Sequence, residues 1–314
     1  MSYVYVENLV KKYGDLTAVD HISFTVEKGE IFGLLGPNGA GKSTTLNVIT
    51  TLTDFNKGEV IINGLDIRKD KSQIKQIIGM VPQDIAIYNH LSAYENVKFF
   101  ASLYGLRGSR LRKNVLEALE FVGLSDKIKE KPKNMSGGMR RRLNIACGIA
   151  HDPRLIVLDE PTVGVDTQSR EHILNSIRQL RDRGATVIYT SHYMQEVEEI
   201  CDRIAIIDKG KMIALGTERE LVSMVTDVKS IYVETRIPAG FDREAFCKKL
   251  KLMPGVKAVK AEDAVIRVDV SIEQNGTERI IQEFLNHRLP IDNIKSEVPN
   301  LDTLFLTLTG RELR

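Results

Sequence analysis

The sequence has little of several features that mark common protein classes. Its 314 residues include only three cysteines, and these lie far apart at Cys147, Cys201 and Cys247, without a C-x-x-C pair or a Cys/His cluster. This spacing argues against a disulfide framework and a thiolate metal site, and it suits a reducing compartment. Lys and Arg number 44 against 42 Asp and Glu, a formal charge of only +2. The chain therefore lacks the global basic field of a nonspecific nucleic-acid-binding protein.

Long apolar runs are missing as well. No stretch approaches the ~18 to 20 consecutive apolar residues of a membrane-spanning helix. The first residues, MSYVYVENLVKKYG, lack the charged-then-apolar order of a signal peptide. The hydrophobic fraction of 42% is nevertheless enough for a substantial core, and the length suits two domains. We expect a cytoplasmic protein, which would need a separate membrane-spanning partner to act across a bilayer.

Strands are expected in two parts of the chain. Short strands are predicted within residues 3 to 35 and over 58 to 67, where GEVIINGLDI turns at Asn63-Gly64. Three later runs are nearly all apolar: RLIVLDE (154 to 160), TVIYTSH (186 to 192) and RIAIID (203 to 208). Helical stretches such as TQSREHILNSIRQLRDRG separate these runs. Apolar strands that alternate with helices are typical of a buried parallel sheet, so an α/β fold is expected.

Two successive helices are predicted between these strand regions. Ser92 and Glu95 form a capping box ahead of AYENVKFFASLYG, and the next helix, SRLRKNVLEALEFVG, ends at Gly123. Its apolar stripe consists of Leu111, Val115, Leu116, Leu119 and Val122. The two helices indicate a helical subdomain.

The pattern changes near residues 222 to 230. The remainder of the chain predicts strand, helix, two strands, helix and strand, which is the βαββαβ order of a ferredoxin-like unit. A last helix, NLDTLFLTLTG, should begin at Asn300 and end at Gly310. Its apolar residues Leu301, Leu304, Phe305 and Leu308 should lie on one side of the helix. The chain is thus expected to divide into a domain over residues 1–222 and a small α+β accessory domain over residues 228–314.

A glycine-rich loop carries the strongest chemical signal. GPNGAGKS, from Gly36 to Ser43, matches G-x-x-x-x-G-K-[ST], follows the apolar strand IFGLL and precedes the helical run TTLNVITTL. Glycines let backbone N–H groups wrap a β-phosphate, Lys42 supplies a cation for the β and γ oxygens, and the Ser43 hydroxyl suits Mg²⁺. The alternative is a glycine-rich turn without a ligand, which the matching strand and helix on either side make the weaker interpretation.

The segment LIVLDE places two carboxylates at the end of an apolar strand. Asp159 ends the strand, where a carboxylate would meet Mg²⁺, and Glu160 comes directly after it. Catalytic groups of such sheets lie at the carboxyl ends of the strands. Glu160 is therefore the candidate general base that polarises an attacking water.

NMSGGMRRR, residues 134 to 142, has two possible meanings. It could be a flexible basic loop that grips nucleic acid, or a helix start that binds a phosphate through a serine cap and bare backbone N–H groups. Leu143, Ala146, Cys147 and Ala150 mark the buried stripe of the same helix. Arg140, Arg141 and Arg142 are therefore expected on or near its exposed flank, and a nucleic-acid partner is not expected.

With these motifs in this order, residues 1 to about 222 resemble the ATP-binding cassette (ABC) ATPases. The resemblance implies a P-loop NTPase fold, with a mixed sheet and a helical subdomain over about 86–150. It implies ATP and Mg²⁺ as cofactors, and Tyr13 looks like the aromatic that stacks on adenine. The remaining implied ATP contacts are Gly36, Pro37, Asn38, Gly39, Ala40, Gly41, Lys42, Ser43 and Thr44.

The resemblance also assigns the hydrolytic groups. Gln83 in GMVPQD matches the glutamine that touches Mg²⁺ and links the site to the membrane partner. His192, at the end of TVIYTSH, matches the switch histidine that contacts the γ-phosphate. Glu160, His192 and Gln83 are thus the implied catalytic residues. Ser43, Gln83 and Asp159 are the implied Mg²⁺ contacts.

The family signature L-S-G-G-Q falls where this chain has MSGGM. Met135 and Met139 depart from it, and Met139 leaves that position without a polar side chain. In the family this segment closes over ATP bound to a second subunit, so a dimer, expected to be of identical chains, is implied. The implied contacts across the dimer are Ser136, Gly137, Gly138 and Asp166.

SGGMRRRL and the ending PNLDTLFLTLTGREL resemble ATPase subunits of the daunorubicin/multidrug exporters. The implied protein hydrolyses ATP to power a separate multi-span permease from the cytoplasmic face of the membrane. The permease would dock on the surface after Gln83, which includes Tyr88, Tyr94, Phe99 and Phe100. One alternative is a soluble ABC ATPase of translation or DNA repair, but this chain has neither a second cassette nor a long coiled-coil insertion. Another is a regulatory subunit without turnover, against which Glu160 and His192 argue.

Overall fold

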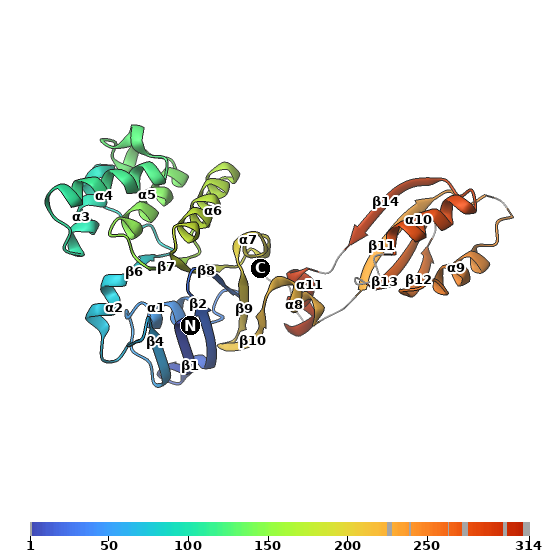
Figure 1. Cartoon of the computed structure of the whole chain (residues 1–314), viewed down its shortest axis with the longest axis horizontal. Helices are drawn as coiled ribbons and strands as arrows, with labels where there is room; N and C mark the ends of the chain where they lie inside the picture. Colours follow the sequence, from blue (N-terminus) through green and yellow to red (C-terminus); the bar gives the residue numbers. More distant parts are fainter. Residues whose placement is uncertain are drawn as a thin grey trace. The chain divides into compact units, whose positions relative to one another are not determined.

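The computed structural model describes residues 2–224, 228–238, 240–262, 264–271, 276–297 and 300–309. The chain forms two compact units, Met1–Glu218 and Arg219–Glu312, whose helices and strands are labelled in Figure 1. Each unit has an apolar core of its own. No helix in the described part of the chain is both long and apolar enough to cross a membrane.

A six-stranded sheet in the order β10-β9-β3-β8-β7-β6 forms the centre of the first unit. Its strands are β3 (Ile31–Leu35), β6 (Ile78–Val81), β7 (Leu155–Asp159), β8 (Thr186–Ser191), β9 (Arg203–Asp208) and β10 (Lys211–Gly216). All are parallel except β10, which pairs antiparallel with β9. Every residue of β3, β7 and β8 is buried, which explains their continuous apolar sequences. The carboxyl ends of the five parallel strands lie along one edge of the sheet.

The short strand β6 is not predicted by the sequence. Its residues, IGMV, include a glycine, which is depleted in strands. A Cβ at Gly79 would overlap the carbonyl oxygen of Gly148. The glycine therefore lets α5 (Gly137–Ile149) pack directly on β6. β6 is the edge strand of the sheet beside β7, and it leads into the loop that carries Gln83.

A second, antiparallel sheet has the order β2-β1-β4-β5. Its strands are β1 (Ser2–Tyr13), β2 (Leu16–Glu27), β4 (Lys57–Ile62) and β5 (Leu65–Asp66). β1 and β2 are longer than the short strands expected. Asn8 and His21 have positive φ angles of 47° and 55°, and the register shifts between Val6 and Leu9, but the two strands remain paired on both sides of these positions. Such irregularities interrupt the alternation of buried and exposed residues while the pairing continues.

The core of the first unit lies between the two sheets. The helix α1 (Lys42–Ile49) contributes Leu46, Val48 and Ile49, which pack with apolar residues of both sheets. The glycine-rich loop between β3 and α1 is therefore held at both ends by buried elements. The other helices outside the helical subdomain are α2 (Lys71–Ile77), α6 (Thr167–Asp182) and α7 (Met194–Ile200).

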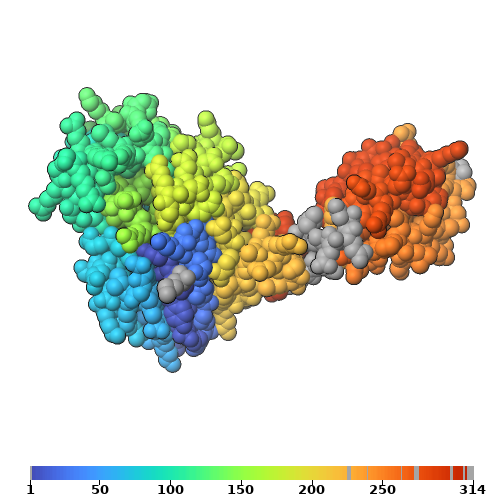
Figure 2. Space-filling view, in the orientation of Figure 1, coloured from blue at the N-terminus to red at the C-terminus, as the bar shows by residue number. Residues whose placement is uncertain are grey.

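The helical subdomain contains α3 (Ala93–Leu103), α4 (Gly108–Phe121), two short 3-10 turns, η1 (Ser125–Lys127) and η2 (Pro132–Asn134), and α5. The green residues of α3 and α4 gather in one lobe, apart from the blue residues of β1 and β2 (Figure 2). The predicted capping box of Ser92 and Glu95 is confirmed in both directions. Of the predicted apolar stripe, Leu111, Val115, Leu119 and Val122 are buried, whereas the Leu116 side chain is 37% exposed. It lies at the border of the stripe.

The second unit begins near α8 (Glu218–Ser223) and contains a four-stranded antiparallel sheet in the order β12-β13-β11-β14. Its elements in chain order are β11 (Val228–Thr235), α9 (Arg243–Lys251), β12 (Val256–Glu262), β13 (Val265–Ser271), α10 (Thr277–Asn286) and β14 (Ile291–Glu297). Phe246 and Leu250 of α9 and Phe284 of α10 pack on the same apolar sheet face. Both helices therefore cover one face of this sheet.

The helix α11 (Leu301–Thr309) ends the described chain. The Asn300 side chain accepts a hydrogen bond from the Thr303 backbone N–H at 3.0 Å, which confirms the predicted cap. Of the four apolar residues predicted to share one side of this helix, Leu301, Leu304 and Phe305 are fully buried, whereas Leu308 is 44% exposed. Periodicity shows which residues share a side of a helix but not how far the covering surface extends. The predicted end at Gly310 lies outside the described residues.

Candidate active site

The glycine-rich loop joins the carboxyl end of β3 to the first turn of α1. Two of its positions have room only for glycine, because the backbone of other strands lies close to them. A Cβ at Gly36 would overlap the carbonyl oxygen of Ile207, and a Cβ at Gly41 would lie 2.6 Å from the carbonyl oxygen of Ala18. Gly41 also has a φ of 106°, which L side chains rarely adopt. Because β9 and β2 press on the loop from two sides, its backbone N–H groups are held in a narrow turn. Such a turn suits a phosphate.

Lys42 places its ammonium group inside this loop. The side chain is only 4% exposed, and Nζ donates to the carbonyl oxygens of Gly36 at 2.7 Å and Pro37 at 3.3 Å. Nζ also lies 3.3 Å from Oε1 of Glu160. Ser43 and Thr44 follow in the first turn of α1 and are half-buried. The loop thus presents a cation and two hydroxyls from adjacent positions.

Glu160 is the centre of the predicted catalytic group. Its buried carboxylate contacts Lys42 through Oε1, while Oε2 accepts a hydrogen bond from Nε2 of Gln83 at 3.0 Å. Nδ1 of His192 lies 3.3 Å from the same Oε2, but the pair lacks hydrogen-bond geometry, so this is a close approach only. Lys42, Gln83, Glu160 and His192 come from four separate segments of the chain. The structure brings them together at the carboxyl edge of the central sheet.

Asp159, the last residue of β7, is also buried at this edge. Its Oδ1 accepts a hydrogen bond from Oγ1 of Thr190 at 2.7 Å, and the same Oγ1 accepts from the Glu160 backbone N–H at 2.9 Å. Thr190 in β8 therefore orients both carboxylate residues at once. Sequence reasoning missed it, although a threonine near the end of the apolar run TVIYTSH is a signal that could have been followed.

We expect Thr190→Val to slow nucleotide hydrolysis and to lower the unfolding free energy by about 1 to 3 kcal/mol, because the buried Glu160 N–H would lose its acceptor. Thr186→Val is a matched control. It makes the same change in the same strand, and it removes an acceptor of the Gly29 N–H at the opposite edge. Phosphate release and thermal unfolding would be measured for both variants. An equal loss of turnover in the two would contradict the positioning role of Thr190.

A second buried network supports the same edge. Oε2 of Glu196, on α7, accepts hydrogen bonds from the hydroxyls of Thr162 at 2.8 Å, Tyr189 at 2.7 Å and Ser191 at 3.0 Å. Burial, together with this carboxylate, raises the pKa of Tyr189 well above its usual range, so the phenol remains a donor. The network ties the segment after Glu160 to the end of β8. It was not predicted, because its members are scattered along the sequence.

Among the described residues, no three His, Cys, Asp or Glu side chains gather as a metal site. Any metal ion at the predicted site would therefore be held by only one or two protein side chains of these kinds. The carboxylate of Asp159 and the hydroxyl of Ser43 are oxygen donors of the kind that Mg²⁺ uses together with waters and substrate phosphates. These two groups fit that ion, although they do not make a protein cage for it.

Tyr13 lies apart from the Glu160 cluster, at the end of β1. Its ring is 48% exposed, and Lys11 places Nζ 4.7 Å from the ring centroid. The paired strand β2 carries Ala18, whose carbonyl oxygen approaches Gly41. The exposed ring is thus carried by a hairpin that borders the glycine-rich loop.

The segment Ser136–Gly138 begins α5. The Ser136 hydroxyl accepts from the Met139 backbone N–H at 3.2 Å, so the predicted serine cap is confirmed. A Cβ at Gly138 would overlap Ser169, whereas a Cβ at Gly137 would meet only the Gly164 carbonyl oxygen at 3.8 Å.

Asp166 does not lie free in its loop. Its carboxylate caps α6, accepting from the backbone N–H of Ser169 at 2.9 Å and from that residue's hydroxyl at 2.7 Å. Gly138 therefore packs on the start of α6, while Gly137 stays open.

The expectation that all three arginines lie on or near the exposed flank of α5 was wrong for Arg141. It is 4% exposed, and its guanidinium donates to the carbonyl oxygen of Pro82 at 3.1 Å. Arg142 is half-buried and donates to the carbonyl oxygen of Val122 at 2.8 Å. Both side chains tie α5 to neighbouring loops, because the helix packs across more of its circumference than the apolar stripe indicates. Only Arg140 is exposed.

The sequence matches a known protein family and is similar to characterised proteins. Residues 19–163 match the family model described as ABC transporter. The chain is 44% identical to the linearmycin resistance ATP-binding protein LnrL of Bacillus subtilis (strain 168), over 98% of each chain. It is 35% identical to the Nod factor export ATP-binding protein I of Ralstonia nicotianae, over 98% of this chain and 94% of the relative.

Solved structures agree with this comparison. The dimeric post-hydrolysis state of the ATP-binding cassette MJ0796 bound to ADP and Pi matches 68% of this chain and 98% of that one, with a TM-score of 0.62 and 29% identity. The ATP-binding subunit of another ABC transporter matches 71% of this chain and 93% of that one, with a TM-score of 0.65 and 26% identity.

Proposed function

The chain belongs to the ABC transporter family, and we propose that it is the subunit that binds and hydrolyses ATP for an exporter whose membrane-spanning permease is a separate protein. The observation that carries the proposal is the convergence of Lys42, Gln83 and His192 on the Glu160 carboxylate at the carboxyl edge of the sheet. A buried carboxylate surrounded by a cation, an amide and an imidazole suits a base that orients water beside a phosphate.

In this proposal the glycine-rich loop binds the ATP phosphates. Backbone N–H groups of Gly36 to Gly41 surround the β-phosphate, Lys42 contacts the β and γ oxygens, and Tyr13 stacks on adenine. Bound phosphates would attract the Lys42 ammonium away from Glu160, 3.3 Å from it. The Glu160 carboxylate would then be free to accept a proton from water.

Ser43 and Asp159 would hold Mg²⁺, with Gln83 as a third contact, and the ion would neutralise charge on the transferring phosphoryl group. Thr190 keeps the Asp159 carboxylate oriented for this role. His192 would contact the γ-phosphate from the end of β8. The presence of both Glu160 and His192 supports turnover over a nucleotide-binding subunit without hydrolysis.

The phosphate site would be completed by a second subunit, in a dimer of identical chains. Ser136, Gly137 and Gly138 at the start of α5 offer a capped helix N-terminus to the γ-phosphate. The carboxylate of Asp166 is already used as the cap of α6, so its contribution across the dimer would come from the loop backbone around it. The dimeric cassette among the structural neighbours supports this arrangement.

The permease would dock on an aromatic cluster beside the Gln83 loop, with the ATPase peripheral on the cytoplasmic face of the membrane. Tyr88 and Phe99 are 42% and 38% exposed, with ring centroids 5.1 Å apart, and Phe100 lies 5.4 Å from Phe99. Tyr94 is half-buried at the first turn of α3. Exposed aromatic rings in contact with one another are typical of a protein interface.

A double replacement of Tyr88 and Phe99 by alanine should separate the permease from the ATPase. We expect co-purification from membranes with the multi-span partner to fall roughly tenfold or more, because large aromatic rings are frequent interface hot spots. ATP hydrolysis by the isolated subunit should change little. Leu116→Ala, on the exposed side of α4, is the control with a similarly exposed apolar side chain. Undiminished recovery of the permease, or recovery of ribosomes or DNA by the unaltered chain, would contradict the proposal.

The second unit is proposed to be a ferredoxin-like accessory domain, with residues 1–222 and 228–314 as the two domains. Its element order and its antiparallel sheet order, β12-β13-β11-β14, support this assignment. Subunit contact or regulation is the proposed role, with ligand sensing as the alternative. The similarity to a linearmycin resistance protein supports a drug-type exporter.

A further inference from the structure

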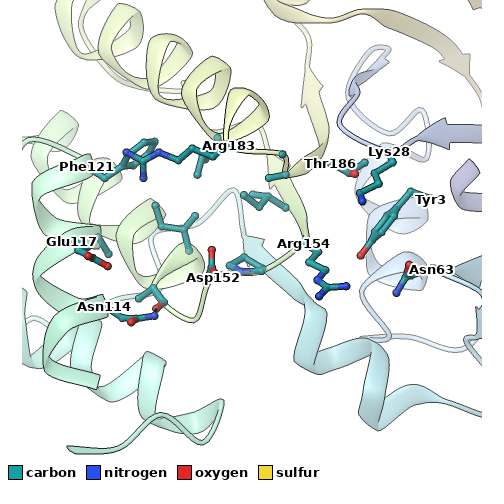
Figure 3. A pocket seen from close by; sticks show the side chains of 18 of the residues that line it. Tyr3, Lys28, Asn63, Asn114, Glu117, Phe121, Asp152, Arg154, Arg183 and Thr186 are labelled. Atoms are coloured by element: carbon teal, nitrogen blue, oxygen red, sulfur yellow. Dashed lines mark hydrogen bonds between the residues drawn. The ribbon is translucent and has the colours of Figure 1, made fainter. Parts of the chain in front are cut away.

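A large cavity lies in the first unit, at the edge of the central sheet opposite to Glu160. Its volume is about 730 Å³, and its lining includes Arg154 and Thr186, which stand at the amino ends of β7 and β8. Figure 3 shows Asn114, Glu117 and Phe121 on one side, Tyr3, Lys28 and Asn63 on the other, and Asp152 and Arg154 between them. The proposed ATP site uses none of these residues.

The cavity wall carries an excess of positive charge. Its cationic side chains are Lys28, Arg110, Lys113, Arg154 and Arg183, and its carboxylates are Glu117 and Asp152. Two of these cations have a partner: Lys113 lies 3.7 Å from Glu117, and Arg183 stacks over the Phe121 ring, 4.5 Å from its centroid.

For Lys28, Arg110 and Arg154, no carboxylate in the described part of the chain lies within ion-pair distance. They come from a turn, a helix and a loop that lie far apart in the sequence. Their positive charges therefore line the cavity without ion-pair partners, and five lining cations against two carboxylates leave the lining a formal charge of +3.

Two further features distinguish the cavity from an ordinary solvated surface. The Tyr3 side chain is only 5% exposed, and its hydroxyl has no hydrogen-bond partner among the described residues. Burial raises the pKa of Tyr3, so this hydroxyl keeps its proton and remains a donor. Lone cations on a convex surface are normal, but three cations without ion-pair partners and a buried donor around one concave space are suited to an anion.

We propose that this cavity binds a small molecule that carries two or more phosphate groups. Its volume falls within the ~300 to 1,000 Å³ of small-molecule sites. A ligand with several negative charges can contact Lys28, Arg110 and Arg154 together, whereas a neutral ligand would leave them without ion-pair partners. The occupant would bridge α4 of the helical subdomain to the opposite wall formed by β1 and the Lys28 turn.

The same cavity touches elements that lead to the proposed ATP site. Ile149 ends α5, whose first turn follows Ser136, and Arg154 precedes β7, which ends at Asp159. A ligand in the cavity would therefore contact the end of α5 and the residue before β7, two elements whose opposite ends lie at Ser136 and Asp159 of the proposed ATP site. This consequence rests on the proposed function, but the binding itself does not.

The test is calorimetric titration of tripolyphosphate into the full-length chain saturated with ADP, which fills the glycine-rich loop. We expect binding at one site. Arg154→Ala and Lys28→Ala should each weaken it roughly tenfold, since each removes one charge-assisted contact. Arg112→Ala is the control, because it removes an exposed cation of α4 that does not line the cavity. Thermal unfolding of each variant checks that it is folded.

Equal affinity of the three variants and the unaltered chain would overturn the proposal, as would the absence of tripolyphosphate binding. Binding of poly-glutamate without binding of tripolyphosphate would also overturn it, in favour of an acidic protein segment. A failure of ADP to bind would count against the proposed function instead. The cavity variants would still report on tripolyphosphate in that case, so the two failures are distinguishable.

Discussion

Replacing Glu160 with glutamine is expected to slow ATP hydrolysis by roughly 10² to 10⁴-fold while ATP binding is retained. The amide has nearly the shape of the carboxylate and keeps a carbonyl oxygen for Gln83, but it cannot take a proton from water. The change also releases Lys42 from its 3.3 Å ion pair, which favours its contact with phosphate. Phosphate release, equilibrium ATP binding and ATP-dependent dimerisation by size-exclusion chromatography would be measured.

Glu30→Gln provides the matched control for this experiment. Glu30 is also a buried carboxylate of the first unit, but it precedes β3 at the opposite edge, where it contacts Arg203 at 3.3 Å. We expect this variant to keep normal turnover, with any loss confined to thermal stability. If the Glu160 variant released phosphate at an undiminished rate, Glu160 would not be the base.

Replacing Gly137 with aspartate is expected to prevent ATP-driven dimer closure and to reduce hydrolysis at saturating ATP about a hundredfold or more, as loss of a charge-stabilising group does in other enzymes. The reason is electrostatic, because a carboxylate at the start of α5 would repel the γ-phosphate of the other subunit. An acidic residue in the first turn of a helix is itself favourable. Open space at Gly137 also admits the side chain, so the fold should be unaffected. Dimerisation with ATP and the melting temperature would be measured together.

Gly137→Asn separates charge from size, since it adds a side chain of nearly the same volume without a negative charge. It should reduce closure much less than the aspartate variant. Gly138 is a poorer position for this test, because any side chain there would overlap Ser169 and disturb the start of α6. Full ATP-dependent dimerisation of Gly137→Asp would remove the support for a shared site.

The sequence by itself determined the elements whose identity depends on local chemistry. A phosphate loop needs glycines and a lysine at fixed spacing, and a buried parallel strand needs a continuous apolar run, so residues 36 to 43 and 154 to 160 were recognisable without a structure. The Ser92 and Ser136 caps were predictable for the same reason. The continuation of the strands through Asn8 and His21 was not, because positive φ angles there interrupt a pattern that hydrogen bonding continues.

Only the tertiary structure decided which distant groups meet. Thr190 forms hydrogen bonds that orient Asp159 and Glu160. The Glu196 carboxylate accepts from three hydroxyls, and the Arg141 guanidinium donates to the Pro82 carbonyl oxygen. Nothing in the local sequence around Thr190, Glu196 or Arg141 indicates these partners. The cationic cavity likewise draws its charges from elements far apart along the chain. Local sequence patterns record the conformation of a segment, whereas the partners of a buried polar group and the compensation of a charge depend on how the segments pack.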